Sequence, residues 1–400
     1  MRLLHTSDWH LGRSFHGFDR VDAQRAFLNH LVDLVRDERV DAVLVAGDVY
    51  DRAIPSLEAV ELLEDGLARL SRHATVIVSS GNHDSARRLG FASPLLERAN
   101  VHLRTRLDGI DRPITLDDGR DRVDVYAIPF LEPFTTAAHL GSGESPLERS
   151  HASVLSAAVD RVRGHRAGAG APRAVLMAHA WFTGGVASDS EVDISVGGIG
   201  QASAAMLDGF DYVALGHLHT PQALDDHVRY SGSPLHYSFS EAGRAKHSCL
   251  VEITGDRVRV TEVPVPTERP LHEVRDSLEA LLTSSAYEQF RGSFLRVHLT
   301  DVPVPQQAMH RLRERFPFVA DLQTVRVERG DAPSVDTLHR LGELDVCRMF
   351  LRDVRGADAD PWETAQLQQA IDLARRGPLA TVDAGPVACD DDEADAGDVG

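Results

Sequence analysis

The sequence predicts an α/β protein with four layers, α/β/β/α, followed by a smaller α/β domain and C-terminal helices. Five apolar runs lack polar alternation and therefore favour strands that are covered on both faces. Amphipathic helical segments lie between the first three runs. Between residues 227 and 263, short runs separated by Gly and polar turns are typical of antiparallel strands. Two sheets with helices on their outer faces account for these observations.

The N-terminal segment predicts alternating strands and helices. In chain order, we predict a strand at 2–10, a helix at 21–38, a strand at 40–51, a helix at 56–72, a strand at 74–84 and a helix at 85–98. Asp19 and Ser56 are candidate caps of the first two helices. The apolar faces of the second and third helices can belong to the core or to a self-association surface.

The following segment predicts the second sheet. We assign to it the strands at 101–103 and 122–130 and the antiparallel strands of 227–263. A long helix is expected at 146–164. The remaining two apolar runs, at 174–179 and 211–219, are strands.

A domain boundary is expected near 267–271. Beyond it we predict a helix at 272–282, a strand at 294–300, a helix at 304–315 and a strand at 324–329. Two amphipathic helices follow, with stripes formed by Cys347, Phe350, Leu351 and Val354, and by Leu367, Ala370, Ile371 and Ala374. These helices either pack on their own domain or bind a partner helix. The expected domains are 1–268, 269–332 and 333–378, with a disordered acidic tail at 379–400.

Composition excludes several classes of protein. Acidic residues outnumber basic ones by 61 to 42, for a net charge of −19, which argues against a broadly basic surface for nucleic acid. The tail and bound divalent cations would account for part of this excess. The three cysteines have no spacing typical of a disulfide framework or thiolate zinc site. No run is long enough for a membrane span, and the N-terminus turns polar too early for a signal peptide, so we expect a cytoplasmic protein.

Metal-type ligands follow the carboxyl ends of all five apolar runs. They are Asp8, His10, Asp48, Asn82, His179, His217 and His219. Such strand ends are the usual binding edge of an open α/β sheet, so we expect these side chains to form a site for two divalent ions. A donor set of oxygen and imidazole without Cys favours Mn, Fe or Zn. His83 is a candidate general acid, and Asp84 can hold its ring.

These residues carry a resemblance to a known family. D-W-H-L-G, G-D-V-Y-D, G-N-H-D, M-A-H-A-W and G-H-L-H resemble, in order, the five motifs of calcineurin-like metallophosphoesterases. The sequence around the first motif and the segment Y-S-G-S-P-L-H-Y-S-F-S-E resemble the bacterial SbcD family of nuclease subunits. This resemblance covers roughly residues 1–375. At His236 the resemblance leads us to expect Lys, as a phosphate contact.

The resemblance implies a manganese-dependent nuclease, with double-strand exonuclease and single-strand or hairpin endonuclease activity. One ion would be held by Asp8, His10, Asp48 and His219, and the other by Asp48, Asn82, His179 and His217. His83 would be the proton donor or transition-state stabiliser, with Asp84 behind it.

The resemblance also implies partners. The helices after the second and third motifs would pair in a homodimer, residues 269–332 would cap double-stranded or hairpin DNA, and the C-terminal helices would dock on an SbcC-like coiled-coil ATPase in a heterotetramer. The protein would be cytoplasmic and associated with the nucleoid, and it would not bind a membrane. A metallophosphatase or cyclic-nucleotide phosphodiesterase on the same fold is the alternative, although such phosphatases usually carry G-N-H-E where this chain has G-N-H-D. A non-enzymatic scaffold is the third possibility.

Overall fold

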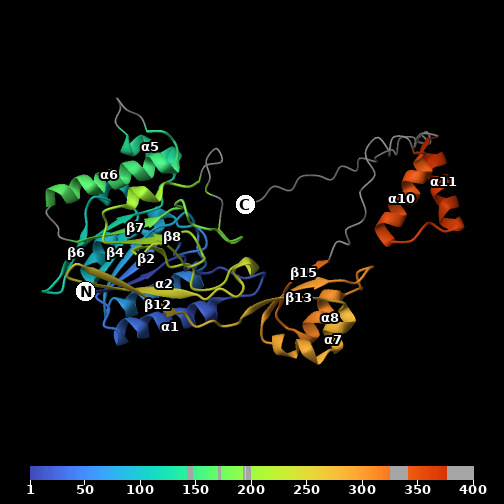
Figure 1. Ribbon diagram of the computed structural model, residues 1–400, viewed down its shortest axis with the longest axis horizontal. Coiled ribbons are helices and arrows are strands. Elements are labelled where there is room, and N and C mark those ends of the chain that lie inside the picture. Colours follow the sequence, from blue (N-terminus) through green and yellow to red (C-terminus); the bar gives the residue numbers. More distant parts are fainter. Residues whose placement is uncertain (142–146, 170–172, 192–193, 195–199, 325–340, 376–400) are drawn as a thin grey trace, which may run out of the picture. The chain divides into compact units, whose positions relative to one another are not determined.

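The computed structural model describes residues 1–141, 147–169, 173–191, 194, 200–324 and 341–375 (Figure 1). Residue contacts divide the chain into two compact units. The first contains residues 1–299 and 307–323, and the second contains the others. The predicted boundaries at 268 and 332 stay predictions, and the predicted acidic tail lies outside the described residues.

The first sheet has the strand order β12-β11-β1-β2-β3-β4. Its strands are β1 (Arg2–Thr6), β2 (Ala42–Ala46), β3 (Thr75–Ser79), β4 (Val101–Arg104), β11 (His247–Thr254) and β12 (Arg257–Pro264). β1 to β4 run parallel, whereas β11 is antiparallel to both β1 and β12. The helices α1 (Val21–Asp37) and α2 (Leu57–Leu70) cover its outer face (Figure 1).

The second sheet has the order β5-β6-β7-β8-β10-β9. Its strands are β5 (Ile114–Asp117), β6 (Arg122–Ile128), β7 (Ala174–His179), β8 (Tyr212–Gly216), β9 (Gln222–Asp225) and β10 (Val228–Tyr230). The three pairs from β6 to β10 are parallel. Two helices, α5 (Pro133–Leu140) and α6 (His151–Ala169), pack on the outer face (Figure 1).

The β2 strand shows why the apolar runs lack alternation. Ala42, Leu44 and Ala46 face the second sheet and join the core between the two sheets. Val43 and Val45 point the other way and pack with the helices on the outer face. Both faces of the strand are therefore buried, which explains why its apolar run is continuous. The predicted α/β/β/α sandwich is confirmed.

Two strand assignments were wrong. β4 and the β11–β12 hairpin belong to the first sheet, although the sequence analysis placed both in the second. β11 pairs with the edge of β1, and its Cys249, Val251 and Ile253 face the core between the sheets. Periodicity identifies a strand and its buried face, but both sheets offer the same apolar surface to that face, so it does not identify the sheet.

Several helix predictions also needed correction. The expected helix at 85–98 is broken into α3 (Ala86–Leu89), α4 (Ser93–Leu96) and the 3₁₀ turn η1 (Glu97–Ala99), because Ala92 adopts a left-handed φ of 59°. Ser56 caps α2 as predicted by accepting the N–H of Ala59. Asp19 instead accepts the N–H of Val21 from a position before the cap. α6 begins at His151, and β5 and α5 were not predicted.

A third sheet in the first unit has three strands in the order β13-β14-β15. The strands and the helices between them are β13 (Leu271–Asp276), α7 (Leu278–Thr283), β14 (Phe294–Leu299), α8 (Ala308–Arg315) and β15 (Val319–Thr324). The predicted helix at 272–282 is thus a strand followed by a short helix that Ser277 caps. The last strand lies earlier than the predicted 324–329, most of which falls outside the described residues.

The second unit contains the two predicted C-terminal helices, α10 (Glu343–Arg355) and α11 (Pro361–Arg375). They pack on each other, and an ion pair joins Arg375 to Glu343. Phe350 is 64 % exposed and Trp362 70 % exposed, so much of their apolar surface lies open. Among the described residues, no helix combines the length and the apolar character that crossing a membrane requires.

Candidate metal centre

The fold brings the seven predicted ligands together between the carboxyl ends of β1, β2 and β3 in the first sheet and of β7 and β8 in the second. Six of them are buried: Asp8, His10, Asp48, His179, His217 and His219. Asn82 is half-buried, as are its neighbours His83 and Asp84. A buried group of two carboxylates and four imidazoles is costly unless its members are paired or bind a metal.

Two glycines let the strand ends approach this closely. A Cβ atom on Gly47, whose φ is +84°, would overlap the imidazole of His179 on the opposite sheet. A Cβ atom on Gly81 would overlap the carboxylate and backbone of Asp48. The Gly in G-D-V-Y-D and the Gly in G-N-H-D are therefore required by contact between the loops.

The backbone at the candidate ligands is strained. Asp8, His10, Asp48 and His217 have φ values of 53°, 44°, 48° and 102°. Non-glycine residues rarely adopt this region, and such residues gather at functional sites where the surrounding fold holds them. At His217 the constraint is visible, since its N–H donates to both oxygens of Asp8, at 3.0 and 3.2 Å.

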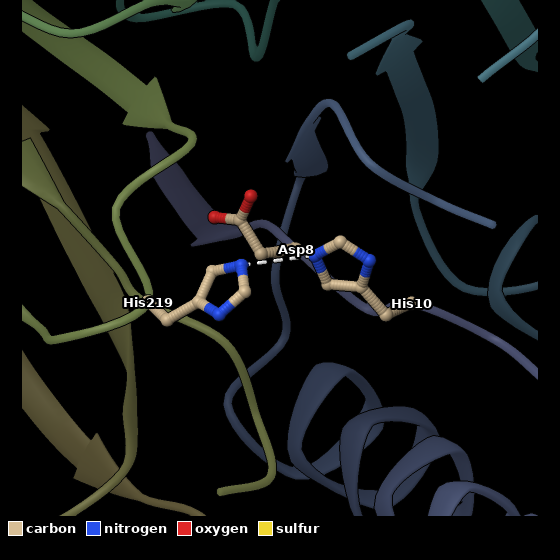
Figure 2. A group of neighbouring side chains, drawn as sticks. All are labelled: Asp8, His10 and His219. Atoms are coloured by element: carbon tan, nitrogen blue, oxygen red, sulfur yellow. Dashed lines mark hydrogen bonds between the residues drawn. The ribbon is translucent and has the colours of Figure 1, made fainter. Parts of the chain in front are cut away.

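Asp8, His10 and His219 form a first cluster (Figure 2). One ligand atom from each lies within 4.8 Å of the others. The Nε2 atoms of His10 and His219 face each other at 2.9 Å. The carboxylate of Asp51 lies 3.6 Å from Nδ1 of His10, on the side away from His219.

Asn82, His179 and His217 form a second cluster. The side-chain oxygen of Asn82 lies 3.0 Å from Nε2 of His179 and 3.2 Å from Nδ1 of His217. Asp48 lies between the two clusters, because its Oδ2 atom is 3.5 Å from Nε2 of His179 and 3.7 Å from Nε2 of His10. Asp48 therefore occupies the position that a carboxylate shared by two ions requires.

The donor chemistry of these side chains fits bound cations. Nδ1 of His179 lies 2.9 Å from the carbonyl of Ala46, which can only accept, so neutral His179 carries its hydrogen there. Its Nε2 lone pair then faces the oxygens of Asn82 and Asp48. Lone pairs that face one another at such distances repel unless a proton or a metal ion lies between them. Oxygen and imidazole donors suit divalent Mn, Fe or Zn.

The charges of the cluster favour metal binding. Burial would raise the pKa of Asp48, but the neighbouring His179, His10 and His83 hold it below its usual range. Burial lowers the pKa of His217 to about 3 and that of His10 and His219 well below the ordinary value. These three imidazoles are therefore neutral near pH 7, as ligands must be.

We expect metal binding to release protons. Burial disfavours the charged form of His179, but Asp48 overcomes this effect and raises its pKa to about 9 in the metal-free protein. A metal ion binds only the neutral imidazole, so below pH 9 the proton competes and the apparent Mn²⁺ affinity should increase as the pH rises toward about 9. Titration calorimetry in buffers of different ionisation enthalpy measures this release. A binding heat that is independent of the buffer near neutral pH would contradict the expectation.

His83 lies beside the clusters with one nitrogen held. Its Nδ1 is 2.8 Å from the carbonyl of Asp51, and its Nε2 is 3.9 Å from Oδ2 of Asp48. Its backbone N–H donates to Oδ1 of Asp48 at 2.9 Å. Nε2 is therefore the nitrogen that remains to meet a substrate.

The prediction that Asp84 holds the His83 ring was wrong. Asp84 accepts the backbone N–H groups of Val49, Tyr50 and Gly81 at 2.9 to 3.1 Å. Three converging backbone donors compete successfully with one ring nitrogen for this half-buried carboxylate. Burial and the nearby Asp48 raise the pKa of Asp84 to about 6. Asp84 fastens the loop that carries Asp48 to the loop that carries Asn82.

The sequence analysis missed the residues that support the ligands. Asp51 holds His83 through its carbonyl, and it could have been found as the last residue of G-D-V-Y-D. Ser190 and Glu191, which contact His219, carry no sequence signal. His236 is buried with its Nε2 bonded to the carbonyl of Arg244, 2.9 Å away, so this ring does not face solvent as the expected phosphate contact would.

Comparison with known proteins gives a family match and several similar solved structures. The family model described as calcineurin-like phosphoesterase matches residues 1–221. Among solved structures, the chain is similar to a protein of Thermus thermophilus, with 13% identity over 65% of this chain and 98% of that chain and a TM-score of 0.38. It is similar to an archaeal phosphodiesterase, with 14% identity, 66% and 100% coverage and a TM-score of 0.29. It is also similar to a dimetal phosphatase from Danio rerio, with 13% identity, 66% and 99% coverage and a TM-score of 0.39. Similarities at this level carry no argument about the substrate.

Proposed function

Because the chain belongs to the calcineurin-like phosphoesterase family, we propose that it is a two-metal nuclease that hydrolyses DNA phosphodiesters. The observation that carries the two-metal part of the proposal is the position of Asp48, whose carboxylate lies within 3.7 Å of imidazoles in both clusters. Manganese is the metal we propose. The other ligands would divide as the sequence motifs imply, with Asp8, His10 and His219 on one ion and Asn82, His179 and His217 on the other.

The residues of the site suit in-line hydrolysis. Two divalent ions, when bound, supply an activated water and neutralise charge on the phosphoryl oxygens. Asp48 lies between the two clusters and links them, and the backbone carbonyl of Asp51 orients the His83 ring. With its Nδ1–H donated to that carbonyl, a protonated His83 presents Nε2–H to the leaving oxygen and acts as the general acid.

The choice of DNA as substrate rests on the sequence around the first motif and on Y-S-G-S-P-L-H-Y-S-F-S-E. These resemble the SbcD nucleases, which implies double-strand exonuclease and hairpin or single-strand endonuclease activity together with an SbcC-like ATPase at the nucleoid. Residues 269–332 would cap the DNA. The exposed apolar residues of α10 and α11, including Phe350 and Trp362, would dock on the coiled coil of the ATPase.

A homodimer surface is part of the same proposal. Four large apolar side chains in and around α2 and α4 are exposed: Ile54 by 71 %, Leu57 by 72 %, Phe91 by 80 % and Leu95 by 67 %. Exposed apolar groups of this size on neighbouring segments are typical of protein–protein contacts. They lie in or next to the helices for which the sequence analysis left core and self-association open, and we propose self-association.

The decisive experiment compares substrates. We expect Mn²⁺-dependent cleavage of linear duplex and hairpin DNA, increased by addition of an SbcC-like coiled-coil ATPase, with slow turnover of bis(p-nitrophenyl) phosphate. His217→Ala is the inactive control. Rapid turnover of small phosphomonoesters or cyclic nucleotides without cleavage of DNA would favour the alternative, a metallophosphatase or cyclic-nucleotide phosphodiesterase. Absence of hydrolysis of every substrate by the wild-type protein in the presence of Mn²⁺ would favour a non-enzymatic scaffold.

A further inference from the structure

Next to the metal centre lies a buried charged pair to which the hydrolytic mechanism gives no role. Lys246 is the single lysine of the chain, and it is only 3 % exposed. It forms an ion pair with Glu241, which is completely buried. Removing two charges from water costs several kcal/mol per ion, and a well-packed apolar pair is often as stable. Stability alone is therefore a weak reason for this pair.

The pair connects to His219 through Ser190. Oε1 of Glu241 accepts the hydroxyl hydrogen of Ser190 at 2.7 Å, while its other oxygen accepts from Lys246. The hydroxyl oxygen of Ser190 lies 2.6 Å from Nδ1 of His219. A hydroxyl has one hydrogen, which the charged carboxylate takes in preference to the uncharged hydroxyl of Ser188, 2.9 Å away. Nδ1 of His219 therefore donates to the serine oxygen.

This chain of hydrogen bonds selects one tautomer of the imidazole. With its hydrogen on Nδ1, His219 presents a bare Nε2 to Asp8 and His10, as a metal ligand must. The backbone of the same residue is also held. Its carbonyl accepts from Nζ of Lys246 at 2.7 Å, and its N–H donates to Glu191 at 2.6 Å.

We propose that Lys246, Glu241 and Ser190 form a positioning relay that sets the tautomer and orientation of His219 for metal binding. The inference rests on the proposed two-metal function. The three residues come from separate segments: the crossover between β7 and β8, the 3₁₀ turn η4 (Phe239–Glu241) and the residue preceding β11. All three are buried, so they act through His219 and not on a substrate.

Without the carboxylate charge, the serine hydrogen is free to turn toward Nδ1, and His219 can then carry its own hydrogen on Nε2, where it blocks the metal. Loss of such a supporting contact typically lowers metal affinity by roughly 10- to 100-fold. The effect should be confined to the ion held by Asp8, His10 and His219. The ion held through Asn82, His179 and His217 should bind as before, since the relay makes no hydrogen bond to them.

The first test uses the unmodified, metal-free protein. Imidazole ¹⁵N correlation spectra should show His219 with its hydrogen on Nδ1, and Glu241→Gln should increase the Nε2–H form. A wild-type His219 in the Nε2–H form would overturn the relay. This readout depends neither on bound metal nor on activity.

The second test measures Mn²⁺ binding by calorimetry in Glu241→Gln, Ser190→Ala and the double variant Glu241→Gln/Lys246→Met. The double variant removes both charges, so it remains informative if Glu241→Gln alone unfolds with an unpaired lysine. Asp124→Asn is the matched control, because Asp124 is a buried carboxylate of β6 that accepts from Thr115 at 2.6 Å. In the relay variants we expect the Mn²⁺ affinity of one of the two sites to fall roughly 10- to 100-fold. In the control we expect the affinity of both sites to be unchanged.

The two hypotheses fail differently. Two Mn²⁺ sites with wild-type affinity in every relay variant would overturn the relay and leave the proposed function intact. Absence of Mn²⁺ binding to the wild-type protein would overturn the proposed function, while the tautomer spectra would still decide whether the relay orients His219.

Discussion

Asp48→Asn should lower the rate of phosphodiester hydrolysis by at least about 10³-fold, at the upper end of the loss caused by removing one preorganised electrostatic contact. The expectation follows from the place of this carboxylate, whose Oδ2 atom faces His179 on one side and His10 on the other. An amide of the same shape keeps the packing but removes the charge that both ions would share. We expect the variant to bind fewer metal ions, measured by elemental analysis, and to cleave duplex DNA at a background rate.

Asp41→Asn is the matched control. Asp41 directly precedes the same strand, at the end away from the site, and its carboxylate accepts the N–H of Arg2 at 2.7 Å. It should keep wild-type metal content and rate. Two bound ions and an undiminished rate in Asp48→Asn would remove the shared-ligand role.

His83→Gln should slow cleavage by roughly 10²-fold or more, the range expected for loss of a general acid, and leave metal content unchanged. Nδ1 of His83 is held by the carbonyl of Asp51, so Nε2 is the nitrogen available to the leaving oxygen. Glutamine preserves polarity and approximate size but cannot supply a proton. The defect should be small for a substrate that releases p-nitrophenolate, because that leaving group needs no proton.

Steady-state rates on duplex DNA and on bis(p-nitrophenyl) phosphate measure this difference. His73→Gln, a substitution at an exposed histidine between α2 and β3, should have no effect. An equal loss on both substrates would assign His83 to transition-state charge stabilisation. Full activity on DNA would remove it from the chemistry altogether.

The site shows how much local sequence predicts. Each ligand follows an apolar strand, and strand ends in parallel sheets are the common binding edge, so convergence of Asp8, Asp48 and His179 followed from pattern alone. The residues that support those ligands could not be predicted from this pattern. Ser190 contacts His219 directly and Glu241 acts on it through Ser190, from positions 29 and 22 residues away in the chain, and no periodicity links them.

The error at Asp84 has a similar origin. Asp84 follows His83 in the chain, so its carboxylate suggests a contact with the His83 ring. In the fold, this carboxylate instead meets three backbone N–H groups from two loops. Adjacent residues often point in different directions, and a carboxylate that is partly removed from water bonds the donors that converge on it.

The sequence by itself determined most of the strands and helices and the identity of the candidate ligands, because alternation, capping and ligand chemistry are properties of short segments. Only the tertiary structure decided that β4, β11 and β12 join the first sheet, and which buried side chains orient the imidazoles. Pairing at a sheet edge and hydrogen bonding across the core depend on residues distant in sequence. Their energies are settled by which groups the completed fold brings into contact.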